Sequence, residues 1–289
     1  VVAERIIPWH KQINKKGDSI CFIRGRPDLQ KLDHTTGKLQ PYCLSSLDGT
    51  SKCPQSDKVV DLAVDEDDAL YVLSRDKDGF ALSVYSDDGQ NMHHCTLEFL
   101  RGKRNFHKIE MNVNNDKNIV IGRLEVDLKT IMVYLCNSNG KRINSFEKSL
   151  NDDDSVEFVS GSCNKEIILL TTRLTPFTFL KCSNVLHVYT QGGQLKKKIK
   201  FHPSDGDDHY SSLCYNPVTK SIIGCVWDFD NARILIEQLS GETAELQYSY
   251  LLSRIIFPLP PYSHLVCHPS GTLALVSDNC FRLLKKASQ

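Results

Sequence analysis

Short apolar runs alternate with polar turns along the chain, and the same arrangement returns about every 50 residues. The stretch YSHLVCHPSGTLALVSD (262–278) nearly copies YSSLCYNPVTKSIIGCVWD (210–228). Four earlier stretches follow the same scheme of a mixed strand, a turn and a more apolar strand: IIPWHKQINKKGDSICFI, KVVDLAVDEDDALYVL, FHKIEMNVNNDKNIVIG and SVEFVSGSCNKEIILLT. Recurrence at a fixed period indicates a series of repeated structural units, because each copy buries its apolar face only against the next copy.

A third strand in each of the first five repeats runs into a turn glycine. Asn-Gly, Asp-Gly and Gly-Gly are hairpin signals, because these turns need a positive φ that glycine adopts at little cost. A fourth strand follows each turn. Four short strands per repeat, without sustained helical periodicity, predict an all-β, six-bladed β-propeller. The turn glycines are Gly37, Gly89, Gly140, Gly193 and Gly241.

The repeats predict a single domain covering residues 1–289. The last repeat ends after its third strand, CFRLLKK, while the chain opens with VVAER. We therefore predict that the N-terminal strand, residues 1–5, completes the last blade and closes the ring, which would protect the edge at the seam. The predicted blades lie at about 6–50, 57–100, 106–150, 155–202, 210–252 and 262–285 plus 1–5.

The charge balance excludes a strong overall preference for anionic partners. Lys+Arg and Asp+Glu number 35 each, so no global field favours nucleic acid or an anionic membrane. No apolar run reaches the roughly 18 residues of a membrane helix, and we expect no membrane partner. The chain does not start with Met, and we expect it to be part of a longer protein.

The eleven cysteines have no CxxC spacing, and Cys21, Cys214 and Cys225 fall in apolar runs. This pattern predicts reduced core thiols rather than a disulfide framework, which favours a cytoplasmic location. Cys43 and Cys53 are the only pair whose spacing would suit a disulfide. The spacing supports no zinc site, and we expect no cofactor.

Two stretches resemble NHL-repeat propellers: SGTLALVSDNCFRLL (270–284) and DEDDALYVLSRDKDGFALSVYSDDG (65–89). The family's Asp after the second strand is present at Asp278 and Asp228, whereas Gly122 and Thr171 stand at that place in two other repeats. The resemblance implies a propeller that often forms the C-terminal recognition part of tripartite-motif (TRIM) ubiquitin ligases, where it binds protein or RNA.

Basic and aromatic residues interleave on the face that carries the loops between blades. RGKRNFHK (101–108) and the later loop TRLTPFTFLKCSN combine cations with rings, which suits single-stranded RNA because phosphates need positive charge and bases stack on rings. The acidic loops NDDDS and SDGDDH weigh against RNA. The RNA or anion-binding candidates are Arg101, Lys103, Arg104, Lys108, Arg123, Arg173 and Lys181.

A stiff apolar connector, RIIFPLPPY (254–262), joins the fifth and sixth repeats. Its prolines restrict the backbone, so little entropy would be lost when a protein partner docks. Packing under the ring face is the alternative for this connector. The candidate protein-binding residues are Ile255, Phe257 and Leu259 here, with Phe177 from the fourth repeat.

One polar residue per inner strand is predicted at the entrance of the central channel: His10, Asp61, Lys108, Glu157, Ser212 and His264. A solvated ring of balanced charges is the simpler interpretation. Ring closure would also make His264, His10 and Asp61 neighbours that could hold a divalent metal, as in a metal-dependent hydrolase or lyase. No GxSxG, P-loop, GxGxxG or HExxH motif occurs.

These observations together predict a non-catalytic recognition module that binds a protein partner through one propeller face. The resemblance implies the substrate-recognition domain of a TRIM-type ubiquitin ligase, whose partner would be a ubiquitination substrate. An RNA-binding domain that uses the basic residues of the same face is the alternative. A metal-dependent propeller enzyme is the third hypothesis.

Overall fold

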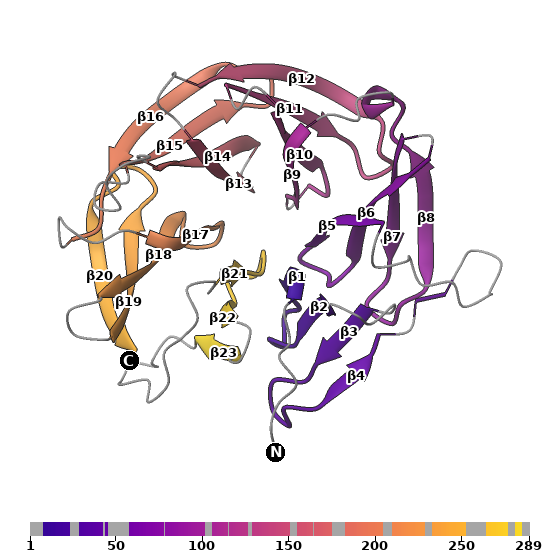
Figure 1. Ribbon diagram of the computed structural model, residues 1–289, viewed down its shortest axis with the longest axis horizontal. Helices are drawn as coiled ribbons and strands as arrows, with labels where there is room; N and C mark the ends of the chain where they lie inside the picture. The colour runs from indigo at the N-terminus through magenta and orange to yellow at the C-terminus, as the bar shows by residue number, and fades with distance from the viewer. Residues whose placement is uncertain are drawn as a thin grey trace.

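A computed structural model describes most of the chain, and its sheets are arranged in a ring (Figure 1). The described residues are 8–23, 29–42, 44–45, 58–77, 79–101, 106–114, 116–126, 129–150, 155–163, 165–174, 183–204, 210–228, 233–252, 264–276 and 281–284.

Five sheets are four-stranded blades in which consecutive strands pair antiparallel. Blade 1 holds β1 (Pro8–Ile13), β2 (Ser19–Ile23), β3 (Leu29–Leu32) and β4 (Leu39–Pro41). Blade 2 holds β5 (Val59–Val64), β6 (Leu70–Asp76), β7 (Gly79–Tyr85) and β8 (Asn91–Thr96). Blade 3 holds β9 (Phe106–Val113), β10 (Ile119–Glu125), β11 (Thr130–Cys136) and β12 (Arg142–Ser149). Blade 4 holds β13 (Ser155–Cys163), β14 (Glu166–Leu174), β15 (Ser183–Thr190) and β16 (Leu195–Phe201). Blade 5 holds β17 (Tyr210–Asn216), β18 (Ser221–Asp228), β19 (Arg233–Ser240) and β20 (Leu246–Leu252).

The last repeat forms a three-stranded sheet of β21 (His264–Cys267), β22 (Leu273–Val276) and β23 (Phe281–Leu284). The structure therefore shows an all-β propeller with five four-stranded blades, and the prediction of six blades closed by an N-terminal strand is wrong. The prediction took the fourth strand of the last blade from residues 1–5, but no fourth strand pairs with β23 in the described residues. Residues 1–5, the predicted closing strand, lie outside the described part.

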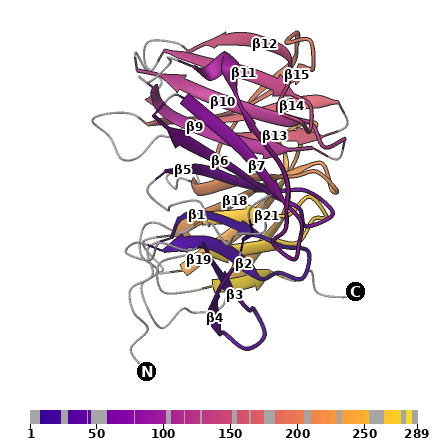
Figure 2. The same ribbon diagram turned by 90° about the vertical axis from the view of Figure 1, so that its right-hand side faces the viewer.

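Each sheet is sandwiched between its neighbours in the ring, as the side view of blades 1 to 3 shows (Figure 2). The second strand of each sheet is consequently packed against a neighbouring sheet on both of its faces. In β10, Ile119 to Leu124 are all buried, which explains why its sequence is an apolar run rather than an alternating pattern. The outer strand β12 is mostly exposed or half-buried and carries polar residues.

Apolar clusters fill every junction between neighbouring sheets. The cluster between blades 2 and 3 is extensive and includes Leu82, Ile109 and Tyr134. At the seam between the three-stranded sheet and blade 1, the described side chains form an apolar cluster of Ile13, Val266, Ala274 and Val276.

Side chains of the inner strands bind the backbone of the next inner strand. Asp61 Oδ2 accepts a hydrogen bond from the Met111 amide at 2.6 Å. Ser212 Oγ accepts one from the Leu265 amide at 2.9 Å. Gln12 Nε2 donates to the carbonyl of Leu62 at 2.8 Å. These bonds hold neighbouring sheets in register around the channel.

A capping residue recurs where five of the six described inner strands turn toward the second strand; the corresponding position after β13 lies outside the described part. The side chain of the capping residue accepts hydrogen bonds from backbone amides of the turn, as in an Asx turn. Asp65 Oδ1, for example, accepts from Asp67 and Ala69 at 3.0 and 2.9 Å. The sequence analysis missed this signal, although it recurs with the same period as the strands. The capping residues are Asn14, Asp65, Asn114, Asn216 and His268.

Four of the five predicted turn glycines have the positive φ that the sequence indicates: Gly37, Gly89, Gly140 and Gly193. Gly241 is different. In blade 5 the positive φ falls on Ala244, and Gly241 is required because a Cβ there would lie 2.3 Å from the carbonyl oxygen of Lys220.

The six cysteines whose side chains are described are free: Cys21, Cys95, Cys136, Cys214, Cys225 and Cys267. For these residues the prediction of reduced thiols is confirmed, whereas Cys43 and Cys53 lie outside the described part. Burial raises the pKa of the Cys225 thiol to about 11, which keeps it protonated and inert at neutral pH. The described residues contain no helix with the length and apolar character that a membrane crossing needs.

We expect Gly193→Ala to destabilise the fold more than Gly37→Ala. Both glycines have positive φ, so each alanine costs about 1–2 kcal/mol in backbone strain. A Cβ at Gly193 would also lie 2.7 Å from the Phe146 Cβ, whereas nothing lies within 4 Å at Gly37. Overpacking adds about 1–3 kcal/mol. Urea denaturation of the two variants measures the difference, and equal midpoints would contradict the packing argument.

Candidate functional site

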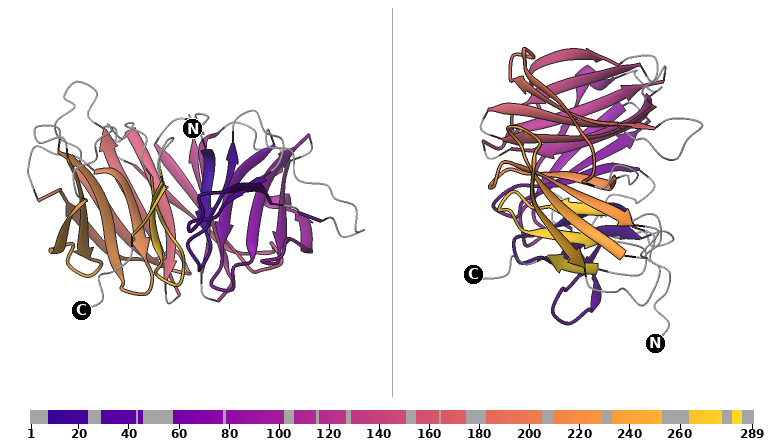
Figure 3. Two further views of the ribbon diagram at one scale, coloured as in Figure 1. Left: turned by 90° about the horizontal axis from the view of Figure 1, so that it is seen from below. Right: turned by 90° about the vertical axis from the view of Figure 1, so that its left-hand side faces the viewer.

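The two faces of the ring differ in their connections. One face carries the tight turns between first and second and between third and fourth strands; the opposite face carries the blade-to-blade connections, and we call it the loop face (Figure 3). Many predicted residues of the loop face lie outside the described part: Lys103, Arg104, Phe177, Lys181, Ile255, Phe257 and Leu259. His10, Glu157 and Arg173 belong to β1, β13 and β14, but their side chains also lie outside it.

Arg101 lies on the loop face, just after the 3-10 turn η1 (Glu98–Leu100). Its side chain is exposed, and its Nη1 lies 3.5 Å from Glu98 Oε2. Its backbone packs against the start of β7, since a Cβ at Gly79 would be 3.6 Å from the Arg101 Cα. This contact fixes Arg101 beside the top of blade 2.

Phe106, the first residue of β9, connects this region to blade 3. Its ring packs against Phe80 with centroids 5.6 Å apart, and the Arg75 guanidinium carbon lies 5.7 Å from the Phe106 centroid. The second contact is a cation–π interaction. Arg75 was not predicted, and only the inter-blade contact places it beside Arg101 and Phe106.

Arg123 lies in β10 with only 3% of its surface exposed. It forms an ion pair with Glu125, and its guanidinium carbon lies 5.8 Å from the centre of the Tyr134 ring. Its Nε and Nη1 atoms are buried without a hydrogen-bond partner. With so little exposed surface, the Arg123 side chain is part of the packing between blades 2 and 3 and is not directly accessible to a partner.

Lys108 lies on the other side of the same sheet. It pairs with Leu124, whereas Phe106 pairs with Glu125, and consecutive residues of a strand point to opposite faces. Its Nζ lies 2.5 Å from Glu110 Oε1. Arg75 packs on the Phe106 ring, and Arg101 packs against Gly79 beside Phe80. Arg123 faces the same side of the blade 3 sheet as Phe106, whereas Lys108 faces the other side.

We define the blade 2–3 patch as Arg75, Arg101, Phe106, Arg123 and Glu125. Val126, which follows Glu125, is 61% exposed at its border. The patch combines arginines, an aromatic ring and exposed apolar surface on strand ends of two packed blades. Such a combination is typical of protein-binding surfaces.

The residues predicted at the channel entrance do not all lie at the same height along the inner strands. Asp61, Ser212 and His264 each precede the capping residue of their turn by the same distance in sequence, and so does Glu110 in blade 3. Lys108 lies nearer the loop face than this level. Asp61 and Ser212 use their side chains to bind neighbouring backbone, as described above. These two residues therefore have a structural role that the sequence analysis did not predict.

Within the described part of the chain, no group of three or more His, Cys, Asp or Glu residues could hold a metal ion. The proposed metal ligand set of His264, His10 and Asp61 includes one side chain outside that part. Both carboxylate oxygens of Asp61 accept hydrogen bonds from backbone amides, those of Leu62 and Met111.

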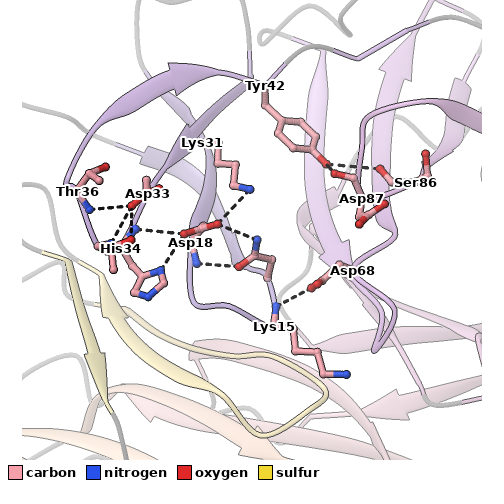
Figure 4. Close-up of polar contacts among 12 residues, drawn as sticks. Lys15, Asp18, Lys31, Asp33, His34, Thr36, Tyr42, Asp68, Ser86 and Asp87 are labelled. Carbon is pink, nitrogen blue, oxygen red and sulfur yellow. Dashed lines mark hydrogen bonds and ion pairs between the residues drawn. The ribbon is translucent and has the colours of Figure 1, made fainter.

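The turn face carries a second polar cluster, centred on Asp18 (Figure 4). The Asp18 carboxylate receives Asn14 Nδ2 at 3.1 Å, the His34 amide at 3.2 Å and Lys31 Nζ at 3.1 Å. Burial raises the pKa of Asp18, but the hydrogen bonds from His34, Lys31 and Asn14 outweigh it and lower the pKa to about 2. The cluster fixes the turns of blade 1.

Asp68 joins three sheets on the same face. Its Oδ1 accepts a hydrogen bond from the Lys15 amide at 2.6 Å and lies 3.1 Å from Nε2 of the fully buried His268. Thr272 Oγ1 also donates to the Lys15 carbonyl at 3.3 Å. These contacts bring blade 2, blade 1 and the three-stranded sheet together at the seam.

No protein-family model matches the chain, and no curated protein matches it. Solved structures do match over almost its whole length. The PQQ-bound aldose sugar dehydrogenase (Adh) from Streptomyces coelicolor is 13% identical, with 94% of this chain and 88% of that chain covered and a TM-score of 0.52. The extracellular domain of the hybrid two component system BT4673 from B. thetaiotaomicron is 15% identical, with coverage of 100% and 39% and a TM-score of 0.50.

The β-propeller domain of Myceliophteria thermophila Cps50 (Swd1) is 10% identical, with 98% of each chain covered and a TM-score of 0.47. At these identities the comparisons show the fold alone. The chain is a β-propeller, and the resemblance to NHL-repeat proteins stays a prediction.

We expect Asp18→Asn to lower the free energy of unfolding by about 2 kcal/mol at pH 7. The folded-state pKa of about 2 lies below the ordinary value of 3.8, so this stabilisation is full well above pH 4 and is lost as the pH falls through about 2. The difference between wild type and variant should thus shrink by roughly half at pH 3. Urea denaturation at the two pH values measures it, with the exposed carboxylate Asp87→Asn as control. A difference independent of pH would contradict the charge-based explanation.

Proposed function

We propose that this chain is a non-catalytic recognition module that binds a protein partner on the loop face, at the blade 2–3 patch. The partner presents an acidic group to the arginines and apolar side chains to Phe106 and Val126. The exposed arginines Arg75 and Arg101, which lie beside Phe80 and Phe106, carry this proposal. A carboxylate of a partner would pair with them, in a site whose strands are already rigid.

The charges of the patch favour a protein over RNA. Glu98 and Glu125 lie beside Arg101 and Arg123, so a run of phosphates would meet two carboxylates as well as the arginines. Lys108 faces the other side of the sheet and pairs with Glu110. A single acidic side chain flanked by apolar residues fits this arrangement better than a nucleic-acid backbone does.

The resemblance to NHL-repeat propellers supports a finer proposal. The bound protein is a ubiquitination substrate, and the propeller selects it for a TRIM-type ligase whose catalytic parts lie outside this chain. The free, buried cysteines support action in a reducing compartment such as the cytoplasm. This finer proposal depends on the protein-binding proposal and fails with it.

A peptide selection tests the site. We expect phage-displayed random peptides selected on the wild-type chain to be enriched in Asp or Glu next to apolar residues. Arg101→Glu should weaken the selected peptides at least about tenfold, which corresponds to about 1.4 kcal/mol. Lys141→Glu is the matched control, because it makes the same charge change at an exposed residue in a turn of blade 3 on the opposite face.

Binding of a fluorescent single-stranded RNA pool, measured at low and physiological salt, tests the alternative that the chain recognises RNA. RNA binding at physiological salt that Arg101→Glu abolishes would replace the protein-binding proposal by RNA recognition. Selected peptides that bind Arg101→Glu as well as they bind wild type would overturn the patch as the site.

A further inference from the structure

The outer strand of blade 5, β20, exposes an apolar surface on the rim of the propeller (Figure 1). Tyr248, Tyr250 and Leu251 are 54%, 46% and 56% exposed. The two tyrosine rings stack, with centroids 6.1 Å apart and an interplanar angle of 29°. This strand is the last of its sheet and pairs only with β19 among the described strands. Its outer edge therefore offers backbone donors and acceptors next to large apolar side chains.

Other long outer strands carry the features that normally block edge-to-edge pairing. β16 has the sequence LKKKIKF, and its lysines would oppose one another in a pair with a second copy. β12, RINSFEKS, carries both charge signs. β20, LQYSYLL, has no charged residue over its whole length. The outer strand β8, NMHHCT, also has no Lys, Arg, Asp or Glu, but it lacks the aromatic pair of β20. Charge therefore protects β12 and β16 against pairing, and β20 combines a neutral edge with exposed aromatic residues.

The centre of β20 reads the same in both directions, as Tyr248-Ser249-Tyr250. If two copies pair antiparallel about Ser249, Tyr248 of each copy lies opposite Tyr250 of the other. Tyr248 and Tyr250 pair with Gln238 and Ile236 of β19, so both point to the same side of the sheet. The pairing would gather four tyrosines on one face without opposing any like charges, and aromatic cross-strand pairs stabilise sheets.

We propose that β20 is a homodimer interface, in which two copies of the chain join edge to edge about a two-fold axis at Ser249. Blade 5 then continues into blade 5 of the second copy as one antiparallel sheet. The interface is isologous, because the same strand serves both copies. It lies on the rim and is independent of the binding proposed for the loop face.

A single strand pair buries less than the roughly 800 Å² per partner of a standard stable complex. We therefore expect a reversible dimer that forms in the micromolar range. Because the interface is expected to be weak, sedimentation velocity should use protein concentrations up to about 100 μM. Over this range the wild type should convert from monomer to dimer.

Two variants test the strand itself. Tyr250→Lys places a lysine in the paired edge and should leave the chain monomeric at every concentration. Ile143→Lys is the matched control, because Ile143 is 57% exposed on the outer strand β12, and this variant should dimerise like wild type. Circular dichroism checks that both variants fold.

Cysteine crosslinking tests the register. Ser249→Cys should form an intermolecular disulfide rapidly on mild oxidation, since the pairing brings this residue opposite its own copy; peptide mapping confirms the bond. Ser149→Cys is the control, because Ser149 is exposed on the outer strand β12 as Ser249 is on β20. A wild type that stays monomeric, a dimer that Tyr250→Lys leaves intact, or equal crosslinking of the two cysteine variants would each overturn the proposal.

Discussion

Burial of both faces of every sheet between its neighbours is the constraint on which the rest of the structure depends. No blade has an apolar core of its own; the clusters lie between sheets, so each sheet is stable only in the ring. The side-chain bonds from Asp61 to Met111 and from Ser212 to Leu265 add directional links at the inner strands. Together these contacts fix how far one blade can turn against the next.

The seam between the first and last repeats combines apolar and polar contacts. Among the described side chains, Ile13, Val266, Ala274 and Val276 form its apolar cluster. On the turn face, Asp68 binds the Lys15 amide and lies beside His268, and Thr272 binds the Lys15 carbonyl. Because hydrogen bonds are directional, these contacts favour one arrangement of the first and last repeats.

The rigid ring presents two chemically different surfaces. On the loop face, Arg101, Arg123 and Phe106 come from different elements but occupy one patch, because blades 2 and 3 pack face to face. On the rim, β20 offers a neutral edge with two stacked tyrosines. A partner with an acidic group suits the first surface, and a second copy suits the second. Both surfaces are formed before binding, so association costs little conformational entropy.

The sequence by itself determined the all-β repeat, most strand positions, the turn glycines at Gly37 to Gly193 and the free thiols, because these follow from local periodicity, backbone conformation and burial. Tertiary structure alone decided the rest. The sequence indicates that the last repeat ends after its third strand, but whether another segment pairs with that strand depends on the tertiary structure, and a repeat count does not contain that information. The grouping of Arg75 with Arg101, the separation of Lys108 from Arg123 and the structural roles of Asp61 and Ser212 depend on strand facing and on contacts between blades. A shift of one residue reverses such facing, so spacing along the chain does not specify it.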